Sequence, residues 1–275
     1  ISTGALIAPF AFLGPAYDGP LREVFTQIDA SNVFQFVGLG GLFGPGLADT
    51  GPLREMVAKH VTPSFLAEIA AEHRKGRRLI VVTTNLDAQR SVVWNMGRIA
   101  EIGTPRALEL FRDVLVASAS VPAVFPPVLI DVESDDLRYH ELHVDGGATL
   151  QVFTLPNAVL VSGAAQRSPP GTSIYMIINN RLFPDFEVVQ ATTIRVAARS
   201  LSTIVKSSAL QTVAQTYEFA RSRGIDFFLT YIGEDFEQEY EGPFNREYMN
   251  ALFEYGYARG RSGDGFLRSL PFDPD

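Results

Sequence analysis

An almost unbroken run of hydrophobic residues lies close to the start of the chain. Nearly every position from Ala5 to Leu13 is apolar, which predicts a helix packed into a core, with Pro9 as a point where it can bend. A turn rich in glycine and proline follows at residues 14–20. Residues 21–28 then predict a short helix.

Two further helices have clear start signals. Thr50-Gly51-Pro52 precedes a helix expected over 53–60, and Thr62-Pro63 supplies an N-cap and a first-turn proline before a helix over 64–73. Residues 78–84 are apolar and β-branched, which is typical of a strand buried on both faces of a parallel sheet. A turn over 85–90 and a neighbouring strand over 91–95 come next.

The rest of the chain continues the alternation of helices and strands. A helix over 105–117 ends in a stretch of small residues and prolines over 118–127. An alternating strand over 137–144 then leads into Asp145-Gly146-Gly147. The later expected elements are a strand over 173–179, one long or two joined helices over 192–222, a strand over 225–232 that closes the sheet, and a helix over 244–259. This alternation predicts one α/β domain with a largely parallel sheet.

Six glycines are concentrated in residues 37–52. They match neither the spacing of a dinucleotide-binding loop nor the Gly-Lys-Ser/Thr ending of a phosphate loop, so we interpret the segment as a flexible surface loop.

Composition narrows the class of protein. The chain has 275 residues, of which 46% are hydrophobic and 20% charged, as in ordinary globular proteins. The net charge of −8 argues against a nucleic-acid surface, and the densest basic run, residues 74–78, fits a solvated helix end. Cysteine is absent, which excludes disulfides, thiolate chemistry and cysteine-based zinc sites. No apolar run reaches the roughly 18 residues that span a bilayer.

The first residues carry the most chemical information. Ser2-Thr3-Gly4-Ala5 matches the later part of a Gly-x-Ser-x-Gly nucleophile elbow, a tight strand-to-helix turn that presents a serine hydroxyl and needs small neighbours. Ser-x-Gly alone occurs by chance in most chains of this length. A second site must therefore support it.

An activated serine needs a base within hydrogen-bonding reach. His143 is the one serious histidine candidate, and a triad of Ser2, His143 and an aspartate from 131, 135 or 136 can be written. Asp145 is the better partner. It ends an apolar strand, where functional side chains of α/β sheets gather, and two glycines let the backbone turn there. Read alone, Asp-Gly-Gly is equally an ordinary turn.

Taken together, these motifs resemble the patatin-like phospholipase family of acyl hydrolases. The matching residues are Ser2–Leu6, the Ser/Ala/Pro-rich stretch 117–127 and Asp145-Gly146-Gly147, with looser matches at 83–87 and 253–256. The resemblance implies a three-layer α/β/α fold with a mostly parallel central sheet, forming a single hydrolase domain over 1–275. It also implies a dyad in which Ser2 is the nucleophile and Asp145 the base, supported by Gly4, Gly146 and Gly147.

The resemblance further implies fatty-acyl ester lipids as substrates, with transient contact at a membrane surface. Val121, Val124, Phe125 and Val128 could line an acyl groove, or equally form core packing behind the dyad. No cofactor, metal or nucleic-acid partner is expected, and no carboxylate cluster has the spacing of a calcium loop.

The chain departs from the family in one respect. It contains neither the strand that leads into the elbow nor the upstream glycine-rich loop that stabilises the oxyanion, so we expect residues 1–275 to be nearly inactive alone. Three alternatives stay open: a catalytically inactive lipid-binding or storage protein on the same scaffold, a Ser-His-Asp esterase that uses His143, and, more distantly, a flavodoxin-like binding module.

Overall fold

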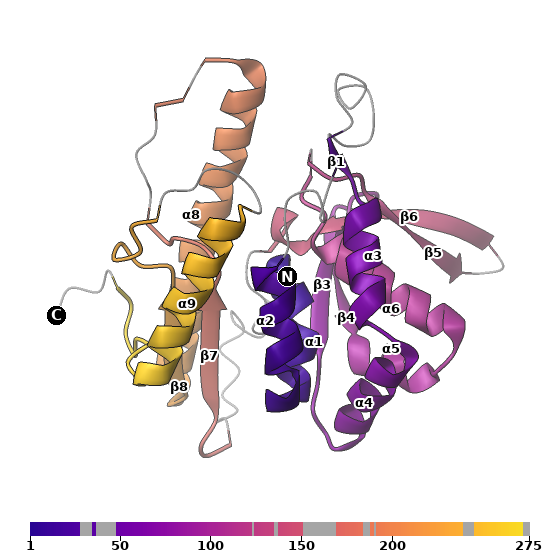
Figure 1. Ribbon diagram of the computed structural model, residues 1–275, viewed down its shortest axis with the longest axis horizontal. Helices are drawn as coiled ribbons and strands as arrows, with labels where there is room; N and C mark the ends of the chain where they lie inside the picture. The colour runs from indigo at the N-terminus through magenta and orange to yellow at the C-terminus, as the bar shows by residue number, and fades with distance from the viewer. Residues whose placement is uncertain are drawn as a thin grey trace. The chain divides into compact units, whose positions relative to one another are not determined.

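The structure is a computed structural model of residues 1–275 (Figure 1). It describes residues 1–27, 35–36, 48–122, 124–134, 137–150, 169–183, 188–189, 191–238 and 245–271. Most of the glycine-rich segment, Asp135 and Asp136 lie outside these residues. The chain forms two compact units, one of Ile1–Leu150 with Glu239–Phe253 and one of Gln151–Gln238 with Glu254–Asp275. Whether 1–275 is a single domain stays a prediction.

The first unit is rich in helices, and most of them follow the expected segments. The apolar run after Ser2 forms one of them, and the helix over 96–102 was not anticipated. The helices are α1 (Thr3–Leu13), α2 (Asp18–Thr26), α3 (Gly51–His60), α4 (Pro63–Arg74), α5 (Met96–Ile102), α6 (Pro105–Ser118) and the start of α9 (Arg246–Ser262), with short 3₁₀ turns η1 (Pro15–Tyr17) and η4 (Gly146–Ala148).

Threonine caps fix the start of two of these helices. The Thr62 hydroxyl accepts a hydrogen bond from the Phe65 amide at 3.3 Å, with Pro63 in the first turn of α4. Thr104 does the same for the Ala107 amide of α6, also at 3.3 Å. Each cap satisfies an amide that has no partner within the helix, so the predicted start signal at Thr62 is confirmed.

A four-stranded sheet forms the centre of the first unit. Its strands are β3 (Ile80–Asn85), β4 (Arg90–Asn95), β5 (Val128–Ser134) and β6 (Leu137–Asp145), in the order β4-β3-β6-β5. All three pairings are antiparallel. A separate antiparallel pair joins β1 (Gln35–Phe36) to β2 (Ala48–Asp49).

The expectation of a mostly parallel central sheet is therefore not confirmed. The apolar, β-branched residues at 78–84 that led to this expectation do form a buried strand, since Val81–Asn85 are all buried in β3. Burial on both faces is common to parallel strands and to antiparallel strands covered by helices. The turn over 86–89 joins β3 directly to β4, and so short a connection produces an antiparallel pair.

Helix α6 covers this sheet by packing against β3, β5 and β6. Phe111 and Val114 of α6 are completely buried, and Val81 and Val128 of the sheet belong to the same hydrophobic core. This packing fixes the C-terminal end of α6 beside the middle of β3 and the C-terminal end of β6. The candidate site is located there.

The second unit contains the parallel strand pair β7 (Ser173–Ile178) and β8 (Asp226–Tyr231). Helix α8 (Thr193–Arg223) connects them as a single long helix and packs against β8. Such a connection is required because parallel strands need a long crossover. The core of this unit includes Met176, Leu182, Val213 and Leu229.

The fold class is thus mixed α/β, as expected at the coarse level. In the part of the chain that the structure describes, no helix combines the length and hydrophobicity needed to span a bilayer.

Candidate active site

Ser2 has an unusual backbone conformation at the start of α1. Its φ of 54° and ψ of −136° place it in a region that non-glycine residues rarely adopt. Such a conformation costs on the order of 1–3 kcal/mol and persists where surrounding contacts enforce it, often at functional sites. Here the Ser2 amide donates to the Ser118 carbonyl oxygen at 2.9 Å.

The last residue of α6 and the two residues after it hold both candidate residues. Ser118 Oγ donates to the Val82 carbonyl at 2.8 Å and accepts from the Ser2 amide at 3.3 Å. Two residues later, the Ser120 carbonyl accepts a hydrogen bond from the Asp145 amide at 2.9 Å. Ser118 and Ser120 are both fully buried. One short segment therefore holds the backbones of Ser2 and Asp145.

Asp145 is a buried carboxyl group at the end of β6. Only 4% of the residue is exposed, and it pairs across the sheet with Thr83 of β3. The Gly147 amide donates to Asp145 Oδ1 at 2.7 Å. Burial raises the pKa of Asp145, while hydrogen bonds from the Ser2 side chain and the Gly147 amide oppose that rise. The Ser2 side chain is thus among the polar groups close enough to the Asp145 carboxyl to affect its pKa.

Gly146 is required by close packing next to this carboxyl. A Cβ atom added there would lie 2.5 Å from the Val82 carbonyl oxygen and 3.2 Å from Ile1 Cγ2. The Gly146 carbonyl in turn accepts from Thr84 Oγ1 at 3.4 Å. The first glycine of the Asp-Gly-Gly motif therefore lets η4 approach β3, and the second supplies the amide that binds Asp145.

The glycine at position 4 is less constrained. It is exposed, and an added Cβ would meet nothing within 4 Å. Ala5, by contrast, is completely buried. The requirement for a small residue is visible at Ala5 and not at Gly4.

The residues expected to line an acyl groove are divided between core and surface. Phe125 and Val128 belong to the hydrophobic core, where they are 6% and 2% exposed. Val121 is half-buried, and Val124 is exposed. Core packing therefore explains Phe125 and Val128, whereas Val121 and Val124 remain candidates for lining an acyl groove.

His143 takes part in a separate buried network. Its Nδ1 lies 2.8 Å from Thr83 Oγ1, and its Nε2 lies 3.2 Å from Glu141 Oε2. The Trp94 indole donates to Thr83 Oγ1 at 2.8 Å. This pattern assigns the proton to Nε2, with the Thr83 hydroxyl donating to Nδ1. Burial lowers the pKa of His143, against the effect of Glu141.

These contacts do not form the Ser-His-Asp triad of Ser2, His143 and a nearby aspartate that the sequence suggested. Both ring nitrogens of His143 face partners other than Ser2, and Asp131 pairs with the exposed His140 at 2.7 Å. Asp135 and Asp136 lie outside the described residues.

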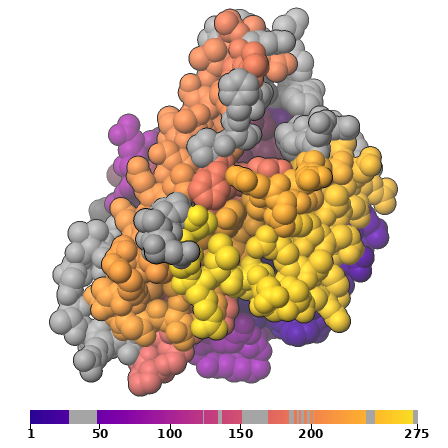
Figure 2. Space-filling view, turned by 90° about the vertical axis from the view of Figure 1, so that its left-hand side faces the viewer, coloured from indigo at the N-terminus to yellow at the C-terminus, as the bar shows by residue number. Residues whose placement is uncertain are grey.

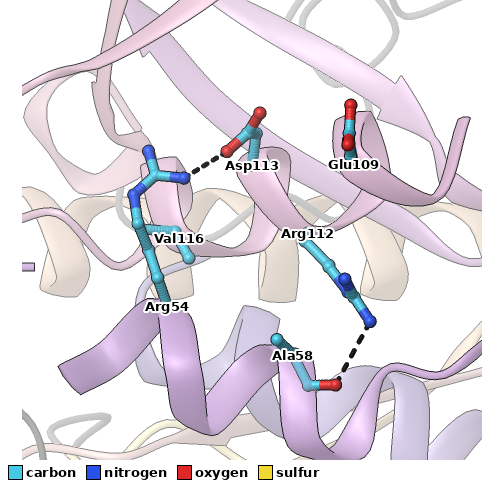
Figure 3. Close-up of a pocket in the computed structure, with 6 residues that line it drawn as sticks. All are labelled: Arg54, Ala58, Glu109, Arg112, Asp113 and Val116. Carbon is cyan, nitrogen blue, oxygen red and sulfur yellow. Dashed lines mark hydrogen bonds and ion pairs between the residues drawn. The ribbon is translucent and has the colours of Figure 1, made fainter. Parts of the chain in front are cut away.

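A pocket of about 310 Å³ lies elsewhere, between α3 and α6 (Figure 3). Arg54 forms an ion pair with Asp113 across it, and Arg112 donates to the Ala58 carbonyl at 3.2 Å and the Val61 carbonyl at 2.7 Å. These contacts satisfy the last carbonyls of α3, which have no partner within the helix. None of the expected site residues lines this pocket. Among the described residues, no group of acidic or histidine side chains could hold a metal ion.

The geometry places a buried carboxyl group near a serine with a strained backbone at the start of a helix. The sequence model of the patatin-like phospholipase family matches residues 1–156, more than half of the chain, and the protein belongs to that family. This family membership supports a hydrolase that acts on lipid esters. A search of curated proteins found no match.

Sequence reasoning missed the contributions of Ser118 and Ser120. The stretch 117–127 was recognised only as a motif of small residues and prolines. A signal was present only for Ser120, because a serine just after an apolar helix can bond a carbonyl that the helix end leaves free. The carbonyls of Ser118 and Ser120 that hold Ser2 and Asp145 belong to the backbone, which residue type does not reveal.

Proposed function

We propose that this protein is a lipid acyl hydrolase of the phospholipase A or esterase type, with Ser2 as nucleophile and Asp145 as general base. The observation that carries the proposal is that the Ser2 side chain lies close enough to the buried Asp145 carboxyl to oppose the rise of its pKa. This proximity brings together the serine and the aspartate of two motifs that are far apart in the sequence. The strained backbone of Ser2 supports the same assignment.

The reaction follows from the two groups. As Ser2 Oγ attacks the ester carbonyl carbon, its proton passes to Asp145, and a tetrahedral intermediate forms. The C–O bond to the alcohol then breaks, and Asp145 returns the proton to the departing oxygen. In the second half, Asp145 takes a proton from water as its oxygen attacks the acyl-enzyme. The bond between the acyl carbon and Ser2 Oγ then breaks, Asp145 returns the proton to Ser2 Oγ, and the fatty acid is released.

Burial makes a carboxylate a stronger base than it is in water. Because desolvation raises the pKa of Asp145, the ionised group accepts a proton more readily than an exposed aspartate would. Helix α1 begins at Thr3, directly after the nucleophile. The positive end of its dipole therefore stabilises negative charge that develops beside Ser2.

The substrate class also implies a place of action. Fatty-acyl esters of glycerophospholipids reside in membranes, so the protein contacts a membrane surface during catalysis. Nucleic acid is not a partner in this proposal, given the net charge of −8.

The test combines covalent labelling with turnover. A fluorophosphonate probe is expected to label Ser2 of the wild-type chain, and the Ser2→Ala variant is expected to remain unlabelled. Asp145→Asn is expected to lower kcat/KM on a short-chain ester by about a thousandfold, the scale of general-base catalysis. Asp131→Asn is the matched control, because Asp131 is an exposed aspartate on β5.

His143 distinguishes the alternative mechanism. We expect His143→Gln to retain turnover per folded molecule, measured with the labelled fraction as the count of competent sites. Loss of turnover in His143→Gln with retention in Asp145→Asn would establish the histidine esterase instead. Because residues 1–275 are expected to turn esters over slowly without the upstream glycine-rich loop, labelling of Ser2 decides between the two classes. A folded wild-type chain that binds lipid and leaves Ser2 unlabelled would be a lipid-binding protein.

A further inference from the structure

The end of β6, which carries Asp145, is paired with the rest of the sheet over a short distance. β6 pairs with β5 over seven residue pairs, and the last of them is at His143. The two residues after His143 are held to β3 by a ladder of three pairs, in which Thr83 is opposite Asp145. The Asp145 amide bonds the Ser120 carbonyl and not β3. Side-chain contacts between β3 and β6 therefore matter for the place of this carboxyl group.

The hydroxyl of Thr83 joins three neighbouring strands. The Trp94 indole of β4 donates to Thr83 Oγ1 at 2.8 Å, and His143 Nδ1 of β6 lies 2.8 Å from the same oxygen. β3 lies between β4 and β6 in the sheet. Both partners are diagonal to Thr83, because Val92 and Asp145 are directly opposite it. Aromatic side chains can reach a diagonal neighbour in a sheet. One hydroxyl thus links the three strands at the level of Asp145.

The bonding capacity of a hydroxyl matches these partners. It has one proton to donate and two positions that accept. The Trp94 indole can only donate, so it uses one accepting position of Thr83 and leaves the proton for His143 Nδ1. His143 Nε2 in turn donates to Glu141 Oε2 at 3.2 Å. The hydrogen bonds therefore run in one direction, from Trp94 to Glu141, and such a chain strengthens each of its members. We call these four residues the Thr83 chain.

Burial makes the chain selective for one strand register. Thr83 and His143 are completely buried, so their hydrogen bond is shielded from solvent. The rings of Trp94 and His143 also pack together, with centroids 5.7 Å apart. A shift of β6 by one residue along β3 would break the bond between Thr83 and His143 and would turn Asp145 to the other face of the sheet. The Thr83 chain therefore favours the register that places Asp145 at the site.

We propose that Thr83 is a positioning residue for the general base Asp145. Its hydroxyl, held between Trp94 and His143, fixes the end of β6 against β3 and so sets the place of the Asp145 carboxyl relative to Ser2. Thr83 transfers no proton in the reaction. The inference rests on the proposed function, because Asp145 is the general base only in that mechanism.

The experiment compares Thr83→Val with Thr83→Ser in the 275-residue chain. Valine keeps the branched shape and removes the hydroxyl, whereas serine keeps the hydroxyl. The rate of Ser2 labelling is measured over a range of fluorophosphonate concentrations, which separates the maximal rate from the half-saturating concentration. We expect Thr83→Val to lower the maximal rate about tenfold at an unchanged half-saturating concentration, because a displaced base activates the nucleophile poorly. Thr83→Ser is expected to recover most of this rate.

Trp94→Phe is a second variant that does not depend on the folding of Thr83→Val. It removes the donor to the Thr83 hydroxyl and leaves the bond between Thr83 and His143. We expect the maximal labelling rate to fall about threefold. Trp94 is the single tryptophan of the chain, so its emission reports directly whether the Thr83 variants change the surroundings of the indole. His143→Gln keeps a donor and an acceptor at position 143, so it is not expected to act as Thr83→Val does.

Thr216→Val is the matched control for the loss of a buried hydroxyl. Thr216 is completely buried in α8, the helix drawn in orange in Figure 2, and its hydroxyl donates to the Thr212 carbonyl at 2.8 Å. The neighbouring Val213 and Ala220 belong to the core of the second unit. The control is expected to label at the wild-type rate per folded molecule, with folding measured by chemical denaturation.

The carboxyl carbon NMR signal of Asp145 gives a readout that does not depend on the reaction. We expect it to move in Thr83→Val, to return toward its wild-type position in Thr83→Ser, and to be unchanged in Thr216→Val.

Three outcomes would overturn the inference: wild-type labelling by Thr83→Val, equal losses in Thr83→Val and Thr83→Ser, or an equal loss in Thr216→Val. Failure of the proposed function would appear separately, as a folded wild-type chain with unlabelled Ser2. In that case the Asp145 signal still decides whether Thr83 places the carboxyl group, and an unchanged signal in Thr83→Val would show that it does not.

Discussion

Ser2 and Asp145 are held by two residues of one segment. The Ser2 amide donates to the Ser118 carbonyl oxygen and the Asp145 amide to the Ser120 carbonyl oxygen, both at 2.9 Å. Since Ser118 also bonds the Val82 carbonyl through its hydroxyl, the start of α1, the end of α6 and strand β3 are fixed to each other at this point. The alignment of the Ser2 and Asp145 side chains thus depends on the C-terminal end of α6 and the residues after it, which bond the backbone amides of these two residues.

Replacing Ser118 by Ala is therefore expected to affect positioning. The change removes the bond to the Val82 carbonyl and one acceptor for the Ser2 amide, which costs about 0.5–1.5 kcal/mol of stability. We expect kcat for ester hydrolysis to fall about tenfold with little change in KM, because small displacements of a nucleophile slow the chemical step. Steady-state kinetics and thermal unfolding measure the two effects.

Ser120→Ala is the control for this experiment. The Ser120 hydroxyl donates to the Val116 carbonyl within the end of α6, while its own backbone carbonyl still accepts from Asp145. A similar loss of stability with nearly normal kcat is expected. Equal kcat in Ser118→Ala and the wild-type chain would show that Ser118 has no positioning role.

Burial of the Asp145 carboxyl should reduce stability at neutral pH. Its pKa is raised above 3.8 in the folded chain, so the folded state favours the protonated form. Proton binding to Asp145 in the folded chain contributes stability that is fully present below the pKa of Asp145 in the unfolded chain. That contribution is lost as the pH rises through the pKa of Asp145 in the folded chain. Asp145→Asn is therefore expected to raise the unfolding midpoint at pH 7 while strongly lowering turnover, and the gain in stability should shrink toward pH 3.8.

Catalysis should show the opposite dependence on pH. As a general base, Asp145 must be ionised, so kcat/KM is expected to fall as pH decreases through its raised pKa. In Ser2→Ala the hydrogen bond that opposes the rise is absent, and the pKa of Asp145 should move higher still. Carboxyl NMR titration of the wild-type chain and of Ser2→Ala measures that shift. An unchanged pKa in Ser2→Ala would contradict the contact between the two side chains.

Much of the helical structure was predictable because its signals are local. Thr62-Pro63 and the apolar runs specify caps and buried faces within a few residues, and the helices at 63–74, 105–118 and 193–223 follow them closely. Strand β5 was missed. Its acidic residues 131 and 133 resemble a turn, yet they alternate with buried Val128 and Ile130, which β6 and α6 cover.

The site was only partly predictable for a similar reason. Asp145 could be proposed because a strand that ends in Asp-Gly-Gly has a local pattern, but its burial depends on Ser118, Ser120 and β3. The environment of His143 depends on Thr83 and Trp94, which pack beside it only in the folded sheet. Periodicity places His143 and Asp145 on one face, but it does not specify which hydrogen-bonding groups each one meets.

Gly146→Ala tests the close approach of η4 to β3. Its Cβ would lie 2.5 Å from the Val82 carbonyl oxygen, which belongs to the backbone of a buried strand and has no room to move. We expect a loss of about 1–3 kcal/mol in the free energy of unfolding, together with reduced turnover because Asp145 shifts with its neighbour. Chemical denaturation and ester hydrolysis provide the measurements.

Gly260→Ala is the matched control for that substitution. Gly260 lies inside α9, and an added Cβ there meets nothing within 4 Å. Alanine forms helices better than glycine, so a gain of about 0.5–1 kcal/mol with normal turnover is expected. If Gly146→Ala proved as stable and active as Gly260→Ala, the steric role of Gly146 would be wrong.

Arg112 and Arg54 line the same pocket but should contribute differently to stability. Arg112 donates to the Val61 carbonyl at 2.7 Å and to the Ala58 carbonyl at 3.2 Å, where α3 ends, whereas Arg54 pairs with the half-exposed Asp113 (Figure 3). Charged hydrogen bonds to carbonyls that otherwise lack partners are worth about 1.5–3 kcal/mol, and exposed ion pairs about 0–1 kcal/mol.

Arg112→Met is therefore expected to lower the free energy of unfolding by about 1.5–3 kcal/mol, and Arg54→Met by less than about 1 kcal/mol. Urea denaturation of both variants measures the difference. Added salt should weaken only the contribution of Arg54, because its ion pair is exposed to solvent. Equal losses in the two variants would mean that the end of α3 does not depend on Arg112, and that its carbonyls are satisfied by water instead.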